Sequence, residues 1–171
     1  MNTIATALSG LALLSGLVTT VATASGSAAA AQAAPECTSA DVAVHYRHTD
    51  DAAGHRYGKI VVTNVADHAC RTGGFGGLSY VGFGDGTQVG AAADREGQAT
   101  RFTLRPGQRA VSKVAETSAA NYPRRRCSPH AVDGFRVYIP NETASLFVAH
   151  RTRGCLNSDV HLLAHRAFRK R

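Results

Sequence analysis

The residues best suited to chemistry form a cluster of histidines and aspartates near residue 50. The cluster contains His45, His48, Asp50, Asp51 and His55. Imidazole and carboxylate groups are ligands for divalent metal ions, which take three or four of them at about 2 Å. His45 and His48 have opposite parity on an extended strand, so they would point to opposite faces of a sheet. We therefore expect no metal site and no cofactor, and keep a secreted hydrolase or metal-dependent enzyme using this cluster as an alternative.

Other catalytic signatures are missing from the sequence. It contains no G-x-S-x-G elbow, no lysine after a glycine-rich phosphate loop and no H-E-x-x-H pair. The glycines at 74 and 76 do not begin a dinucleotide fingerprint, because Ser79 occupies the third glycine position and no helix pattern follows. His161 and His165 share strand parity, but no carboxylate partner is indicated for them. The sequence predicts no catalytic residues and a protein that is not an enzyme.

Basic residues gather in two short clusters that are candidates for anion binding. The formal net charge is +7, and basic patches suit anionic partners. We expect an anionic cell-envelope polymer or an extracellular protein as partner, and no nucleic acid. A further alternative is an inhibitor of secreted enzymes that presents the loop 121–126. The candidate anion-binding residues are Arg124, Arg125, Arg126, Arg166, Arg169, Lys170 and Arg171.

Four cysteines provide the covalent framework. Four cysteines in an exported chain predict two disulfides. No two of these cysteines have the C-x-x-C spacing of a zinc or redox site. Three pairings are possible. We favour Cys37 with Cys70 and Cys127 with Cys155, which close two loops of about 30 residues, each contributing roughly 3 kcal/mol.

Short alternating segments separated by turn residues make up most of the chain. Asp85-Gly86 and Pro106-Gly107 are turn dipeptides, and no segment after the leader has a helical period. The pattern predicts an all-β fold, an immunoglobulin-like antiparallel β-sandwich of about eight strands. Val111 and Val114 are three residues apart, so we expect a bulge or register change there. The expected strands are 41–48, 57–64, 78–83, 87–89, 100–104, 109–115, 134–140, 145–150 and 159–165, with loops at 49–56, 91–97 and 116–133.

The chain divides into a leader, one domain and a short tail. Residues 1–33 contain an apolar run, no charged side chain and a small-residue cleavage pattern, which predicts a secretory signal peptide. Residues 34–165 are long enough for one β-sandwich domain. Residues 166–171 form a basic C-terminal tail, expected to be frayed. We therefore expect a monomer that is secreted, either free outside the cell or associated with the cell wall, and that has no transmembrane segment in its mature form.

Several of these features together resemble the actinobacterial secreted family called domain of unknown function 4232. They are Thr63-Asn64 followed by Cys70, the glycine-aromatic-glycine segment 74–77, the segment 104–107 before the next strand, and the later cysteine pair. Gly76 stands where proline is common in the family. The resemblance implies an exported immunoglobulin-like sandwich with no assigned activity. The function expected is thus a non-catalytic binding or scaffold domain with a basic surface.

Overall fold

The computed structural model describes residues 33–171, so the predicted signal peptide lies outside the described residues except for Ala33. Among the described residues, no helix is long and apolar enough to cross a membrane. The short helical turns are η1 (Ser39–Asp41), η2 (Ala119–Asn121) and α1 (Arg124–Cys127). The strands are β1 (Val42–Ala52), β2 (His55–Asn64), β3 (Cys70–Gly73), β4 (Gly77–Gly82), β5 (Thr87–Val89), β6 (Asp94–Glu96), β7 (Arg101–Leu104), β8 (Arg109–Thr117), β9 (Pro129–Tyr138), β10 (Leu146–Cys155), β11 (Leu163–Arg166) and β12 (Arg169–Lys170).

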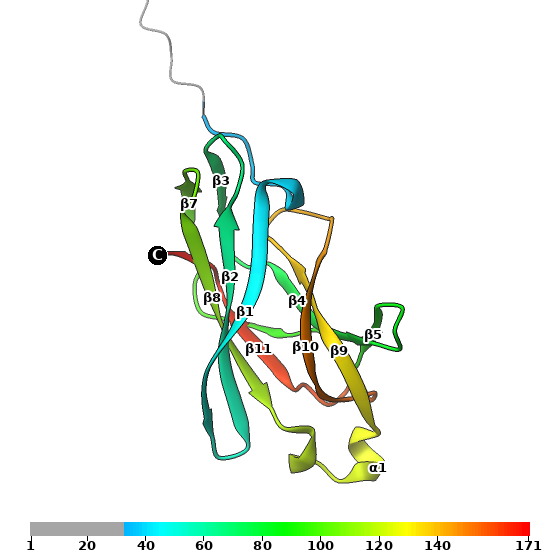
Figure 1. Cartoon of the computed structure of the whole chain (residues 1–171). Coiled ribbons are helices and arrows are strands. Elements are labelled where there is room, and N and C mark those ends of the chain that lie inside the picture. Colours follow the sequence, from blue (N-terminus) through cyan, green and yellow to red (C-terminus); the bar gives the residue numbers. More distant parts are fainter. Residues whose placement is uncertain (1–32) are drawn as a thin grey trace, which may run out of the picture. The chain divides into compact units, whose positions relative to one another are not determined.

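The strands form two main sheets and a small ribbon (Figure 1). The first sheet has the order β1-β2-β8-β11-β6, and β12 also pairs with β8. The second has the order β10-β9-β4-β5, and β3 pairs with β7. All pairs are antiparallel except β11 with β6. The predicted all-β, immunoglobulin-like antiparallel sandwich is confirmed, with more strands than the eight expected.

The core lies between the two main sheets. Alternate residues of each strand point inward, as in β8, where Ala110 and Val114 are buried while Arg109 and Lys113 are exposed. Phe135 of β9 is fully buried and its ring lies 5.3 Å from that of Tyr46 on the first sheet. Each large apolar side chain buried in this way stabilises the fold by about 1.5–3 kcal/mol.

Both favoured disulfides are present. Cys37 bonds to Cys70 at the start of β3, and Cys127 of α1 bonds to Cys155 at the end of β10. All four sulfurs are buried in cysteines that are at most 3 % exposed. The expected pairing is confirmed, and no cysteine in the chain remains free.

The first hairpin is longer than predicted. β1 continues to Ala52 and β2 begins at His55, so the expected loop 49–56 is a turn of two residues. Both turn residues have positive φ, 49° for Ala53 and 78° for Gly54. A two-residue turn of this kind matches the twist of the strands it joins. The polar side chains of 49–52 are therefore exposed strand residues rather than a loop.

The expected bulge in segment 109–115 is wrong. β8 pairs with β2 in one unbroken register from Arg109 to Thr117. Val114 points into the core, whereas Val111 lies on the outer face and is only partly buried. The three-residue spacing therefore records two faces of one regular strand. Glu116 and Ser112 are polar residues at inward positions, so apolar and polar residues do not alternate regularly along β8.

Four further segments differ from expectation. Residues 70–73, which lie outside every expected strand, form β3 and pair with β7. Residues 94–96, expected as loop, form β6, which pairs in parallel with β11. The expected connection 116–133 is shorter, because β9 begins at Pro129. The strand expected at 159–165 is β11, which begins later, at Leu163, and ends at Arg166.

The basic tail is part of the sheet rather than frayed. β12 pairs with β8, and the Phe168 amide donates to the Gly74 carbonyl at 2.8 Å. Ala167 and Phe168 are each 3 % exposed. Their burial fixes the end of the chain against the glycine segment. There, a side chain at Gly76 would collide with the Tyr138 carbonyl.

Candidate functional site: a row of basic side chains

Four basic side chains form a row across four neighbouring strands of the first sheet. The register pairs Arg47 of β1 with Lys59 of β2, and Lys59 with Lys113 of β8. The antiparallel register of β11 brings Arg166 level with Lys113. Direct cross-strand partners share one face of a sheet, with Cβ atoms about 4.5–5.5 Å apart. We call Arg47, Lys59, Lys113 and Arg166 the cation row.

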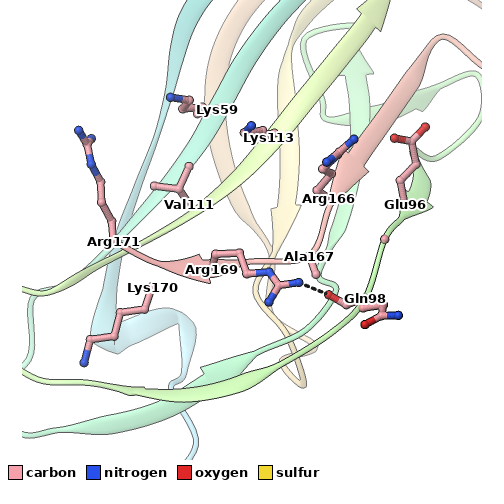
Figure 2. Close-up of a pocket in the computed structure, with 11 residues that line it drawn as sticks. Lys59, Glu96, Gln98, Val111, Lys113, Arg166, Ala167, Arg169, Lys170 and Arg171 are labelled. Carbon is pink, nitrogen blue, oxygen red and sulfur yellow. Dashed lines mark hydrogen bonds between the residues drawn. The ribbon is translucent and has the colours of Figure 1, made fainter.

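One carboxylate ends the cation row. Arg166 pairs with Glu96 of β6, the last strand of the sheet. Figure 2 shows Lys59, Lys113, Arg166 and Glu96 in that order across neighbouring strands. The two ends of this line of side chains therefore differ in charge. Basic residues occupy four strands, and an acidic residue occupies the fifth.

Three members of the cation row, Lys59, Lys113 and Arg166, line a groove of about 460 Å³ on the outer face of the sheet. Val111 contributes to its floor, and the segment around Gln98 and the end of the chain form its sides (Figure 2). Arg169 donates to the Gln98 carbonyl at 2.9 Å and to the Thr100 hydroxyl at 3.0 Å. Arg169 thus ties one side of the groove to the other. Lys170 donates to the Thr103 carbonyl at 3.0 Å.

Within residues 33–171, no side chain of the cation row forms an ion pair, although Glu96 lies opposite Arg166. Within residues 33–171, the arginine ion pairs are made by Arg56, Arg71 and Arg101, none of which belongs to the row. In the same part of the chain, the side chains of the row make no hydrogen bond or ion pair; the one side-chain hydrogen bond to a member runs from the Ser112 hydroxyl to the Arg166 backbone carbonyl. Unpaired like charges on adjacent strands repel one another and attract anions. The arrangement can therefore bind negative charge without breaking an existing contact.

The structure separates the two predicted anion-binding clusters. Arg166, Arg169, Lys170 and Arg171 all line the groove. Residues 124–126 do not; they lie on α1, far from the chain end in Figure 1. The Arg126 guanidinium instead lies over the Tyr122 ring at 6.0 Å.

Sequence reasoning missed three members of the cation row. Arg47, Lys59 and Lys113 stand singly in the sequence among strand residues. Their alternation marks them as outward-facing, but only the register between distant strands places them side by side. Cross-strand register was the missing information.

The histidine cluster near residue 50 is dispersed. His48 lies 3.0 Å from Asp51, and the His55 ring contacts the Thr117 hydroxyl at 3.2 Å. His45 is exposed on the outer face, where it pairs with Val61. Residues 33–171 contain no group of three or more His, Cys, Asp or Glu placed to hold a metal ion. The arrangement in the described region offers no ligand set to the metal-enzyme alternative.

The proposed inhibitor loop 121–126 is also not an extended segment. It runs from the end of η2 into α1, and the Asn121 side-chain Nδ2 donates to the Gly54 carbonyl at 3.1 Å. Ser118 caps η2 by accepting from the Ala120 amide. These contacts hold the segment against the β1–β2 turn.

A buried carboxylate joins the two main sheets. Glu116 of β8 is 3 % exposed. Its Oε1 accepts from the Tyr46 hydroxyl at 2.7 Å, and its Oε2 accepts from the Tyr80 hydroxyl at 2.6 Å. His150 Nε2 lies 2.8 Å from Oε2 and donates to it, because an ionised carboxylate only accepts. Three strands, β1, β4 and β10, thereby converge on one side chain.

The electrostatics of this network favour an ionised Glu116. Burial raises the pKa of Glu116, but hydrogen bonds from His150 and Tyr80 outweigh it and hold the pKa below its ordinary value. Burial and the neighbouring carboxylate raise the pKa of both tyrosines. A cavity of about 390 Å³ opens beside Glu116 between η2 and β10. Both carboxylate oxygens are already engaged within the fold, so the network acts as a clamp between the sheets.

The fold and site define a disulfide-stapled β-sandwich with a basic outer face. The family model described as Domain of unknown function (DUF4232) matches residues 37–169, and the chain belongs to this family. The match spans both disulfides and the whole of the four strands that bear the cation row. No curated protein and no solved structure gives a significant match.

Proposed function

We propose that this protein is an extracellular, non-catalytic domain that binds an anionic polymer of the cell envelope through the cation row. The observation that carries the proposal is the alignment of Arg47, Lys59, Lys113 and Arg166 on adjacent strands, with none of these side chains in an ion pair among residues 33–171. In the free protein the like charges of such a row repel one another, which is unfavourable. A bound polyanion neutralises them and releases counter-ions, which is favourable.

The covalent framework supports an extracellular location. Two disulfides form and persist in oxidising compartments. The predicted signal peptide points the same way. Outside a cell, the abundant anions are wall polymers, lipid headgroups and acidic proteins, so a wall polymer is the partner that we favour.

Co-sedimentation with purified cell wall tests the proposal. We expect binding at about 50 mM salt that weakens strongly by about 200 mM, because contacts to a polyanion release counter-ions. The double variant Lys59→Gln/Lys113→Gln should lose most of this binding. Arg124→Gln/Arg125→Gln removes the same charge elsewhere and is the matched control, which should bind like the parent protein.

Two results would count against the proposal. Absence of sedimentation at low salt would remove the wall polymer as partner. Equal loss in both double variants would show that overall charge, and not the cation row, is responsible.

A further inference from the structure

We infer that the cation row is a linear binding site for a single chain of a flexible polyanion. The polymer chain lies perpendicular to the β-strands, and each of the four basic side chains binds one of its anionic groups. The inference rests on the proposed function and specifies its ligand. The ligand class is an unbranched polymer with one singly charged group per repeat, a phosphodiester or a carboxylate.

The sheet itself sets the direction and length of the site. Adjacent strands lie about 4.7–4.9 Å apart, so four positions span roughly 15 Å perpendicular to the strands. Glu96 follows Arg166 on the last strand and would repel a fifth anion. At the opposite end, Arg47 lies on β1, the edge strand of the sheet. The site therefore accommodates four charges, with a closed end at Glu96 and an open end at Arg47.

On the outer face of the two central strands, the charge other than that of Lys59 and Lys113 lies away from the row, because Arg109 is at the start of β8, four residues from Lys113. Lys59 and Lys113 have uncharged neighbours on both sides along their own strands. A two-dimensional anionic surface would be matched by charges spread over the whole face, whereas a chain is matched by a line. These neighbours are Tyr57 and Val61 on β2 and Val111 and Ala115 on β8.

The groove favours a chain over a membrane. Lys59, Lys113 and Arg166 line a groove whose sides are formed by the segment near Gln98 and by the chain end (Figure 2). The Arg169 hydrogen bonds to Gln98 and Thr100 hold these sides in place. A flat lipid surface would rest on the sides of the groove, while a single polymer strand can lie within it.

The aromatic side chains argue against single-stranded nucleic acid. Such ligands are held by bases stacked on aromatic rings. Two of the most exposed aromatic side chains in residues 33–171 are Phe83 and Phe147, 52 % and 62 % exposed. Phe147 is on β10 and Phe83 follows β4, so both belong to the second sheet. The cation row has only Tyr57 nearby, which cannot stack successive bases.

A length series tests the linear site directly. The purified protein is titrated with poly(glycerol phosphate) oligomers and, separately, with oligogalacturonates of one to eight repeats, by calorimetry at low salt. We expect the affinity to rise at least tenfold from one repeat to four and to change little beyond four. The log–log salt slope for the tetramer should be about −3, as four contacts to a single-stranded polyanion predict. The two series show whether phosphodiester or carboxylate is preferred.

Position-specific variants test the order of the row. Lys113→Gln interrupts the row and should weaken tetramer binding at least fivefold, whereas Arg124→Gln removes equal charge outside the row and should leave it unchanged. Arg47→Gln should shorten the site, so that the affinity stops rising at three repeats. Glu96→Gln removes the closing carboxylate and should strengthen binding of longer oligomers. Thermal midpoints of all variants establish that each one is folded.

Distinct results would overturn this inference and the proposed function. Wall binding that persists together with length-independent oligomer affinity would overturn the linear site alone. Equal effects of Lys113→Gln and Arg124→Gln would do the same. Binding to phosphatidylglycerol vesicles as tight as to the longest oligomers, and lost in Lys113→Gln, would assign the row to a lipid surface instead. Failure to bind either wall or oligomers would overturn both.

Discussion

Glu116 shows how one residue can decide the stability of the sandwich. Its carboxylate accepts hydrogen bonds from two tyrosines and His150, and these reach it from three strands. Hydrogen bonds to a buried charged group are worth about 1.5–3 kcal/mol. Glu116→Gln should therefore lower the free energy of unfolding at pH 7 by about 2 kcal/mol, measured by urea denaturation. Glu96→Gln, at an exposed position, should change it by less than about 0.5 kcal/mol.

The same carboxylate predicts an acid dependence. The pKa of Glu116 in the folded protein lies below its ordinary value of 4.5. The unfolded chain therefore binds the proton first as the pH falls, and stability decreases from about pH 4.5 downward. In Glu116→Gln this part of the acid dependence should disappear. An unchanged pH profile in the variant would show that other carboxylates govern acid unfolding.

His165 should also make stability fall on acidification, and at a higher pH than Glu116 does. It is 3 % exposed, its Nε2 has no hydrogen-bond partner, and burial holds its pKa below the ordinary value of 6.5. The unfolded chain binds this proton more readily, so stability falls as the pH drops below 6.5. His165→Leu should flatten the decrease in thermal midpoint between pH 7 and 5. The exposed His161→Leu is the control, and an equal flattening in it would contradict this origin.

At the scale of elements, the sequence predicted strands well wherever apolar and polar residues alternate. β2 and the strands after Asp85-Gly86 and before Pro106-Gly107 were expected close to their observed bounds, whereas β1 runs four residues beyond the expected 41–48. β3, β6 and β12 were missed because each is at most four residues long, too short to show an alternating pattern. Such strands are held by a neighbour rather than by their own pattern. The cation row was missed for the same reason: register is a property of strand pairs.

The C-terminal strand is held by one aromatic side chain. Phe168 is buried against the glycine segment, and its amide bonds to Gly74. Phe168→Ala should cost about 3 kcal/mol and release the side of the groove that β12 forms. Thermal unfolding and amide exchange of residues 169–171 would measure the two effects. Phe83→Ala removes an exposed ring and should change stability little; an equally mild effect of Phe168→Ala would mean that the tail is not held this way.

The cation row should cost the first sheet stability. Lys59 and Lys113 are direct cross-strand partners of like charge. Their repulsion is worth about 0.2–1 kcal/mol at low salt and is screened at high salt. Lys113→Gln should therefore raise the free energy of unfolding by roughly 0.5 kcal/mol at low salt and by almost nothing near 1 M salt. Denaturation of Lys113→Gln and Arg124→Gln at both salt concentrations would separate this pair from a general charge effect.

At the scale of the whole molecule, the all-β class and both disulfides were predictable, whereas the candidate site was not. Turn residues, alternation and an even number of cysteines are local or countable features. The facing of Glu116 with Tyr80, or of Arg47 with Lys59, depends on how distant strands meet. Of the anion-binding residues predicted from the sequence, those at the chain end line the groove, whereas those on α1 do not.

The Cys37–Cys70 disulfide connects the start of the domain to β3, at the edge of the sandwich where β3 pairs with β7. It closes a loop with a sequence separation of 33, and a cross-link of that size restricts the unfolded chain by about 3 kcal/mol. The double variant Cys37→Ala/Cys70→Ala, which leaves no unpaired thiol, should therefore lower the thermal midpoint by on the order of 10 °C.

The matched variant Cys127→Ala/Cys155→Ala removes the disulfide that ties α1 to β10. Its sequence separation is 28, so its loss should have a similar effect on stability. Because neither disulfide touches the cation row, both variants should still bind wall polymer when folded. An unchanged midpoint in the first variant would show that β3 is held by its pairing with β7 alone.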